Sequence, residues 1–131
     1  MGEILEKEEF SKDFDYIMPV PLHLSRKRER GYNQSRILAE EISKTVSVPL
    51  LEKVLIRKKK TKDQTHLSPE ERERNVRGAF VARADSTLRG KKVILVDDVM
   101  TTGATLKECA RVLKQAGARE VIGVTLVVVN P

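Results

Sequence analysis

The sequence predicts an α/β fold in which a mainly parallel, twisted sheet is flanked by helices. Two observations predict it. Apolar, mostly β-branched runs at 93–96 and 121–129 are typical of strands in a buried parallel sheet. Between them, residues 105–116 carry apolar or small side chains at helical spacing. Because strand and helix signals alternate along the chain, we expect helices on both faces of the sheet.

Length and composition indicate one soluble domain covering residues 1–131, with 40% hydrophobic and 34% charged residues. No apolar run reaches the ~18 residues that a membrane-spanning helix needs. The N-terminal stretch is acidic and has no signal-peptide core, so we expect a cytoplasmic protein with no membrane partner. The single cysteine, Cys109, cannot form an internal disulfide, and its place on the helical stripe predicts a core residue rather than a nucleophile.

The net charge of +6 fits either a soluble surface or an attraction for polyanions. Those polyanions would be phosphorylated small molecules or nucleic acid. Aromatic residues make up only 4% of the chain, which argues against a base-stacking surface.

The first third of the chain predicts three elements. Residues 1–14 are highly charged, and we expect a short helix or a frayed start. Residues 16–21 predict a short strand that two prolines end. Residues 34–46 predict a helix. Its apolar face consists of Leu38, Ala39, Ile42 and Val46.

Further elements follow before the central strand. Ser68 and Glu71 form a capping box with Pro69 at the first helical position, which predicts a helix start. After the central strand, Gly117 is expected to close the last helix as its C-cap. The remaining predictions are a turn and strand at 48–56, a mobile basic loop at 57–66, a short helix to about 74, a strand at 78–81 and a turn at 85–90.

The most informative stretch is 93–105. Its apolar strand stops at two adjacent carboxylates, and a short hydroxyl-rich loop then leads into a helix. Loop amides and a helix N-terminus together bind anions, and a glycine lets the backbone approach a phosphate closely. We therefore expect a phosphate cradle here. It consists of Thr101, Thr102, Gly103, Ala104 and Thr105.

The two carboxylates, Asp97 and Asp98, sit beside this predicted cradle and would repel a phosphate. They should therefore face vicinal sugar hydroxyls or a magnesium ion. A ligand with a 5′-phosphate at one end and ribose hydroxyls in the middle satisfies both halves of the motif.

The stretch resembles the phosphoribosyl-pyrophosphate (PRPP) signature of type I phosphoribosyltransferases. An ordinary βα turn, whose acids merely solvate a strand end, stays open as an alternative. A receiver domain fits poorly, because its paired acids follow the first strand rather than a late one. A Walker-type phosphate loop is excluded, since no Gly-Lys-Ser/Thr follows the strand.

A second candidate anion site is the basic loop at 26–30, which holds Arg26 and Arg30 and leads into the helix at 34–46. It follows a strand of an α/β unit, where ligands collect, so we favour pyrophosphate binding over a merely solvated loop.

Other regions narrow the resemblance. Residues 19–23 and 30–35, with the spacing of polar residues over 57–80, resemble the ComF family of competence-associated phosphoribosyltransferase-like proteins. The likeness covers about 15–129. It implies a pyrophosphate loop around 26–30 and a flexible loop within 57–75. The basic residues assigned to pyrophosphate are then Arg26, Arg30, Arg57, Lys58, Lys59 and Lys60.

Two departures from these families stand out. The chain has no paired Cys-x-x-Cys motifs of an N-terminal zinc ribbon, and little chain is left for a hood over a nucleobase. The acceptor base therefore cannot be assigned from the sequence.

The resemblance implies a PRPP-binding protein that transfers phosphoribosyl from PRPP and releases pyrophosphate. Asp97 and Asp98 would be its catalytic pair and would bind Mg²⁺ directly or indirectly. A non-enzymatic regulator that binds PRPP or a nucleotide, and an accessory protein for DNA uptake, stay open as alternatives. The expected ligand is a small phosphorylated molecule, either PRPP or a nucleotide. A DNA partner, a competence helicase and a homodimer are also left open.

Overall fold

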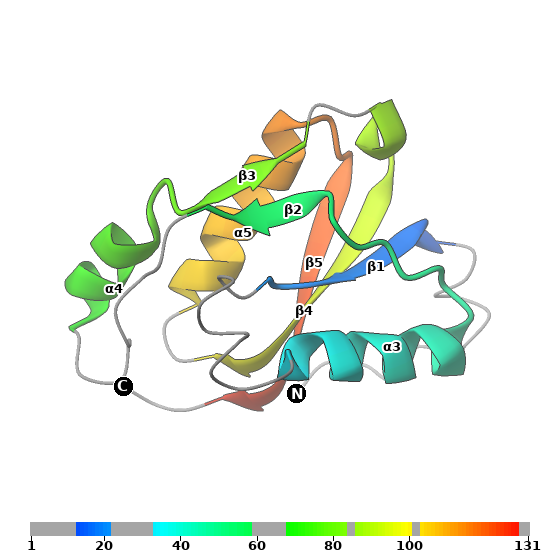
Figure 1. Ribbon diagram of the computed structural model, residues 1–131, viewed down its shortest axis with the longest axis horizontal. Helices are drawn as coiled ribbons and strands as arrows, with labels where there is room; N and C mark the ends of the chain where they lie inside the picture. Colours follow the sequence, from blue (N-terminus) through cyan, green and yellow to red (C-terminus); the bar gives the residue numbers. More distant parts are fainter. Residues whose placement is uncertain (1–12, 22–32, 59–67, 84–85, 101–102, 129–131) are drawn as a thin grey trace.

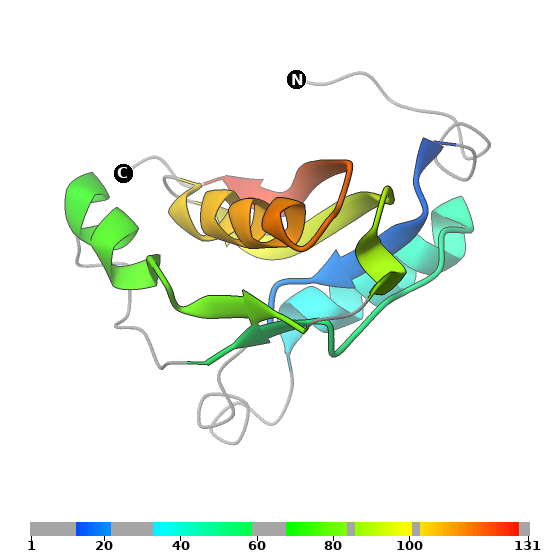
Figure 2. The same cartoon turned by 90° about the horizontal axis from the view of Figure 1, so that it is seen from above.

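A computed structural model describes residues 13–21, 33–58, 68–83, 86–100 and 103–128. Figure 1 shows a central parallel sheet with helix α3 along one face, and Figure 2 shows helix α5 over the opposite face. The predicted α/β architecture, with helices on both faces of a mainly parallel sheet, is confirmed. No helix in these described ranges has both the length and the apolar character to cross a bilayer.

The sheet consists of three parallel strands in the order β1-β4-β5. Their bounds are Tyr16–Pro19, Lys92–Met100 and Glu120–Val128. Successive side chains of β4 point to opposite faces, as the pleat requires. Ile94 packs in the core beneath α3, and Leu95 packs in the larger core beneath α5. Both are at most 1% exposed, so β4 is buried on both faces as predicted.

Helix α3 spans Gln34–Val46, the predicted range. Asn33 caps its N-terminus, since the Asn33 side chain accepts a hydrogen bond from the Ser35 amide. Ser47 ends the helix in the left-handed conformation, with φ 59°. The predicted apolar face packs on the sheet: Ala39 is fully buried, and the other three residues are partly buried against the same cluster. They are Leu38, Ile42 and Val46.

The strand predicted at 48–56 is divided between two partners. Leu50 forms an isolated parallel bridge with Ile17 and covers the outer edge of β1. Only β2, Leu55–Arg57, is a regular strand, and it pairs antiparallel with β3, Phe80–Ala82. The segment predicted as a turn and strand therefore forms a bridge at Leu50 and a short strand from Leu55, because the chain leaves β1 after Leu51 to pair with β3.

Residues 58–79 connect β2 to β3, and we call this connection the excursion. The Lys58 amide donates to the Ala79 carbonyl oxygen over 2.8 Å, which closes the excursion at its base. Its described part contains α4, Pro69–Val76, which begins with the predicted capping box. Helix α4 packs against α5.

Helix α5 spans Ala104–Gln115 and ends in a Schellman motif. The Gly117 amide donates to the Lys114 carbonyl over 3.1 Å, and the Ala118 amide donates to the Leu113 carbonyl over the same distance. Gly117 has φ 112°, so it performs the predicted closing role one position after the cap residue, Ala116. A 3₁₀ helix, η2 at Ser86–Leu88, occupies the predicted turn at 85–90.

Strand β5 is less buried than its valine content predicted. It is an edge strand of the sheet in the described ranges, since its only strand neighbour there is β4. Val121, Ile122 and Val124 are half-buried, and Leu126 is 70% exposed. Helix α3 packs mainly on β1 and β4, which explains why this end of β5 is open to solvent.

Candidate active site at the carboxyl end of the central strand

Asp97 and Asp98 lie inside β4 rather than after it, because the strand continues to Met100 beside β5. The expectation that the strand stops at the acids is corrected on this point. Strand β1 ends at Pro19, which pairs with Val96 immediately before the acids. From Asp97 onward, therefore, β5 is the only strand beside β4 in the part of the chain that the structure describes, and the first turn of α3 lies in the place that β1 has left.

The residue of α3 that meets the acids is Ser35. Its Oγ lies 3.2 Å from Asp97 Oδ1 and 3.4 Å from Asp98 Oδ1, and it accepts from the Asp98 amide over 3.2 Å. Ser35 is only 4% exposed. The sequence had placed it in a family-like motif without a role. The signal that could have found Ser35 is the topology. The helix that follows β1 begins at the carboxyl edge of the sheet, and the acids lie at that same edge.

The pKa of Asp97 is raised to about 7, first by burial and then by the side-chain hydrogen bond and the like charge of the neighbouring Asp98. The Ser35 hydroxyl and the Asp98 amide oppose this by hydrogen bonding to the ionised form. Near neutral pH, Asp97 is therefore protonated for part of the time. A bound cation or hydroxyl donor would favour its ionised form.

The described part of the predicted cradle is the start of α5. Gly103 is the N-cap residue with φ 81°, a conformation that glycine adopts without strain. Ala104 and Thr105 are 5% and 9% exposed. The N-terminus of α5 thus follows the acids closely along the chain, and the positive end of a helix dipole favours an anion. Thr101 and Thr102 lie outside the described residues.

The predicted pyrophosphate residues are only partly described. Arg57 is the last residue of β2, so its predicted place in a mobile loop is corrected. Its guanidinium lies 4.7 Å from the centroid of the Phe80 ring, a cation–π contact across the β2–β3 pair. Lys58 is exposed at the base of the excursion. Arg26, Arg30, Lys59 and Lys60 lie outside the described residues.

Glu108 joins the excursion to α5. It is 8% exposed, accepts from the Gly78 amide over 2.9 Å, and accepts from Arg111 over 2.8 and 2.6 Å. The Arg111 guanidinium holds the pKa of this carboxyl below its usual range. Sequence periodicity missed Glu108, because a glutamate on the buried side of a helix is expected only where it is paired.

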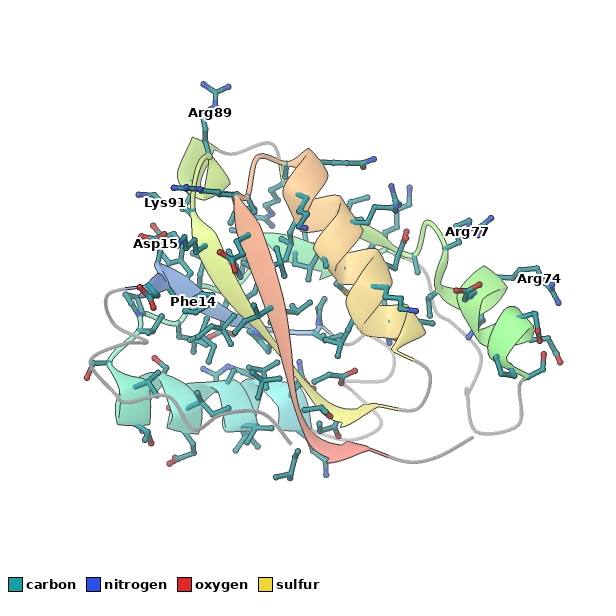
Figure 3. The ribbon with its side chains drawn as sticks, turned by 180° about the vertical axis from the view of Figure 1, so that it is seen from behind. Phe14, Asp15, Arg74, Arg77, Arg89 and Lys91 are labelled. Carbon is teal, nitrogen blue, oxygen red and sulfur yellow. The ribbon has the colours of Figure 1, made fainter. Side chains whose placement is uncertain are left out.

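A shallow pocket of about 140 Å³ lies between the two helices beside Glu108. The pocket is lined on one side by Glu73 and Val76 of α4 and by its cap residue, Arg77. On the other side it is lined by Ala104, Lys107, Glu108 and Arg111 of α5. Figure 3 labels Arg77 of this lining together with Arg74 of α4, and it labels Arg89 and Lys91 near the start of β4.

The acidic pair suits magnesium held jointly with a ligand. The described ranges contain no group of three or more side chains that could hold a metal by themselves. Mg²⁺ is usually bound through one or two carboxylates together with substrate phosphates, and Asp97 with Asp98 supplies such a pair.

Cys109 is fully buried, and burial raises the pKa of its thiol far above the ordinary range. The prediction that Cys109 is a core residue is confirmed.

Comparison with known proteins agrees with this geometry. A family model described as phosphoribosyl transferase domain matches residues 30–130. Competence protein F of Haemophilus influenzae is 39% identical over 106 residues, which cover 80% of this chain and 46% of that protein. Competence protein ComFC of Bacillus subtilis is 32% identical over 130 residues, which cover 92% of this chain and 51% of that protein. This chain therefore spans about half the length of these relatives.

Among solved structures, the purine phosphoribosyltransferase of Pyrococcus horikoshii matches with a TM-score of 0.52 and 21% identity. The match covers 95% of this chain and 77% of that one. At this identity the likeness concerns the fold alone. The predicted type I phosphoribosyltransferase fold and the resemblance to competence proteins are confirmed. The chain belongs to the phosphoribosyl transferase domain family.

Proposed function

We propose that the protein binds PRPP with Mg²⁺ and transfers its phosphoribosyl group to an acceptor, with release of pyrophosphate. The observation that carries the proposal is the placement of Asp97 and Asp98 at the carboxyl end of β4, shortly before the Gly103-capped start of α5. That order matches a ligand with ribose hydroxyls next to a 5′-phosphate. Membership of the phosphoribosyl transferase domain family supports the same reading.

In the proposed reaction, a lone pair of the acceptor forms a bond to the anomeric carbon of the ribose. The bond from that carbon to the pyrophosphate oxygen breaks, and pyrophosphate leaves with the electron pair. The acceptor gives its proton to solvent. Positive charge develops on the ribose ring, and the carboxylates of Asp97 and Asp98 stabilise it while they accept hydrogen bonds from the ring hydroxyls.

The other predicted residues have supporting roles in the proposal. Gly103, Ala104 and Thr105, with Thr101 and Thr102, would hold the 5′-phosphate at the start of α5. Arg57 and Lys58 lie at the base of the 58–79 excursion and would help to bind the leaving pyrophosphate. Arg26, Arg30, Lys59 and Lys60 are assigned to the same anion. Bound Mg²⁺ would supply further charge neutralisation there, with Asp97 and Asp98 as its protein ligands.

The test is pyrophosphate release from PRPP and MgCl₂ in the presence of a panel of nucleobases and small amines. Release that needs both an acceptor and the intact acids supports a transferase. PRPP binding by calorimetry without release under any acceptor would instead support the non-enzymatic regulator. Absence of both binding and release would overturn the proposal.

A role in DNA uptake is the second candidate. It is favoured by the names of the relatives, which are competence proteins, and by the net charge of +6. Electrostatic binding of single-stranded DNA would weaken steeply with salt. Titrations at two salt concentrations, with and without PRPP, would test this role separately from transfer.

A further inference from the structure

We propose that Ser35 is a positioning residue that orients both carboxylates of the acidic pair toward the ligand. The ligand part of this inference rests on the proposed function. The orienting part rests only on contacts within the protein. Ser35 is 62 positions from Asp97 and 63 from Asp98 in sequence, so no local motif joins it to the acids.

The contacts between Ser35 and the acidic pair are all made by the Ser35 hydroxyl. Ser35 Oγ is within hydrogen-bond distance of the Oδ1 atom of Asp97 and of the Oδ1 atom of Asp98. The Asp98 amide is shared, because it lies 2.9 Å from Asp97 Oδ1 and 3.2 Å from Ser35 Oγ. A hydroxyl can donate once and accept twice, so it can accept from the amide and donate to either carboxylate.

This arrangement distinguishes the two oxygens of each carboxylate. The Oδ1 atoms of Asp97 and Asp98 are turned toward Ser35. The Oδ2 atoms are then the oxygens presented to a ribose hydroxyl or to Mg²⁺. The hydroxyl is also neutral. A lysine or arginine at this place would neutralise the acids and compete with a bound cation, whereas a serine orients them and leaves their charge in place.

The backbone that carries the Ser35 hydroxyl is fixed by Asn33. Asn33 Oδ1 accepts from the Ser35 amide over 3.0 Å, and Asn33 Nδ2 donates to the Val20 carbonyl over 3.2 Å. Asn33 therefore ties the start of α3 to the residue that follows β1. Since Ser35 is 4% exposed, its side chain has little room to turn away from the acids.

Three variants test the proposal. Ser35→Ala removes the hydroxyl, and Ser35→Thr keeps it. The matched control is Thr45→Ala, which removes an exposed hydroxyl from the same helix about 15 Å along its axis. Circular dichroism and thermal unfolding check that each variant folds. Crystal structures of the ligand-free proteins then give the carboxylate orientations, and calorimetry gives the affinity for PRPP with MgCl₂.

We expect at least one carboxylate to turn in Ser35→Ala, and the affinity to fall about tenfold or more, as for loss of a hydrogen bond to a charged group. Ser35→Thr should keep the affinity within about threefold, and Thr45→Ala should match the wild type. Unchanged carboxylates in Ser35→Ala would overturn the proposal, as would turned carboxylates with wild-type affinity. If the wild-type protein does not bind PRPP, the proposed function fails, and the crystal structures still decide the role of Ser35.

Discussion

Glu108 of α5 accepts a hydrogen bond from the backbone amide of Gly78, 2.9 Å away and 30 positions earlier in the chain. This contact joins the end of the 58–79 excursion to the helix that starts at the candidate phosphate cradle. Arg111 balances the charge of the same carboxylate. The excursion is thus held by the β2–β3 pair at its base and by Glu108 against α5.

Glu108→Ala should lower the free energy of unfolding by about 2 kcal/mol at pH 7, because it removes a largely buried charged acceptor. The folded pKa of Glu108 lies below its ordinary value of 4.5, so its contribution is present above that value and is lost as the pH falls through the lower folded pKa. Urea unfolding at pH 7 and at acidic pH measures this. Glu41→Ala, at an exposed position of α3, is the control, expected within about 0.5 kcal/mol of wild type. A loss in Glu108→Ala that is equal at both pH values would contradict the prediction.

For Asp97 we predict the opposite dependence of folding stability on pH. Its folded pKa of about 7 lies above its ordinary value of 3.8, so the folded state binds more protons than the unfolded chain between these values. The ligand-free protein should therefore lose stability as the pH rises through this range, up to about pH 7. Thermal unfolding between pH 5 and pH 8 measures the trend. Asp97→Asn should flatten the curve and unfold at a higher temperature than wild type at pH 8. A wild-type curve that rises with pH over the same interval would refute the assignment.

Asp97→Asn combined with Asp98→Asn should abolish Mg²⁺-dependent binding of PRPP, because the amides keep the size but lose the charge that magnesium needs. The fold should survive, since both acids are only half-buried and the amides keep their size. Calorimetry with PRPP and MgCl₂, alongside circular dichroism, measures both effects. Glu41→Gln serves as the charge control. Unchanged binding in the double variant would show that Asp97 and Asp98 take no part in binding PRPP with Mg²⁺.

Gly103→Ala should weaken binding of PRPP and of inorganic phosphate, because φ 81° strains any residue with a Cβ by roughly 1–2 kcal/mol. Gly90 offers a matched control, since it has φ 72° and a Cβ there would meet nothing within 4 Å. Gly90→Ala should cost similar stability and leave the affinity unchanged. If both variants bind equally well, Gly103 has no special part in the cradle.

Local sequence signals determined several parts of this protein. The range 34–46 was predicted correctly because its apolar stripe defines a helix without tertiary help. The capping box at Ser68 and the closing Gly117 were found for the same reason. The acidic pair and Gly103 were identified by the change from strand to helix. Their roles in binding stay predictions.

The tertiary structure decided the rest, because its deciding contacts join distant residues. Packing divides 48–56 between β1 and β3, and it leaves Leu126 exposed although its strand is rich in valine. Glu108 is buried in spite of its charge because Arg111 and the Gly78 amide meet it there. Ser35 reaches the acids because β1 ends one residue before them and α3 begins in the place it leaves. Hydrophobic patterning along one segment carries no information about which segment will lie beside it, so these partners emerge only when the whole core is packed.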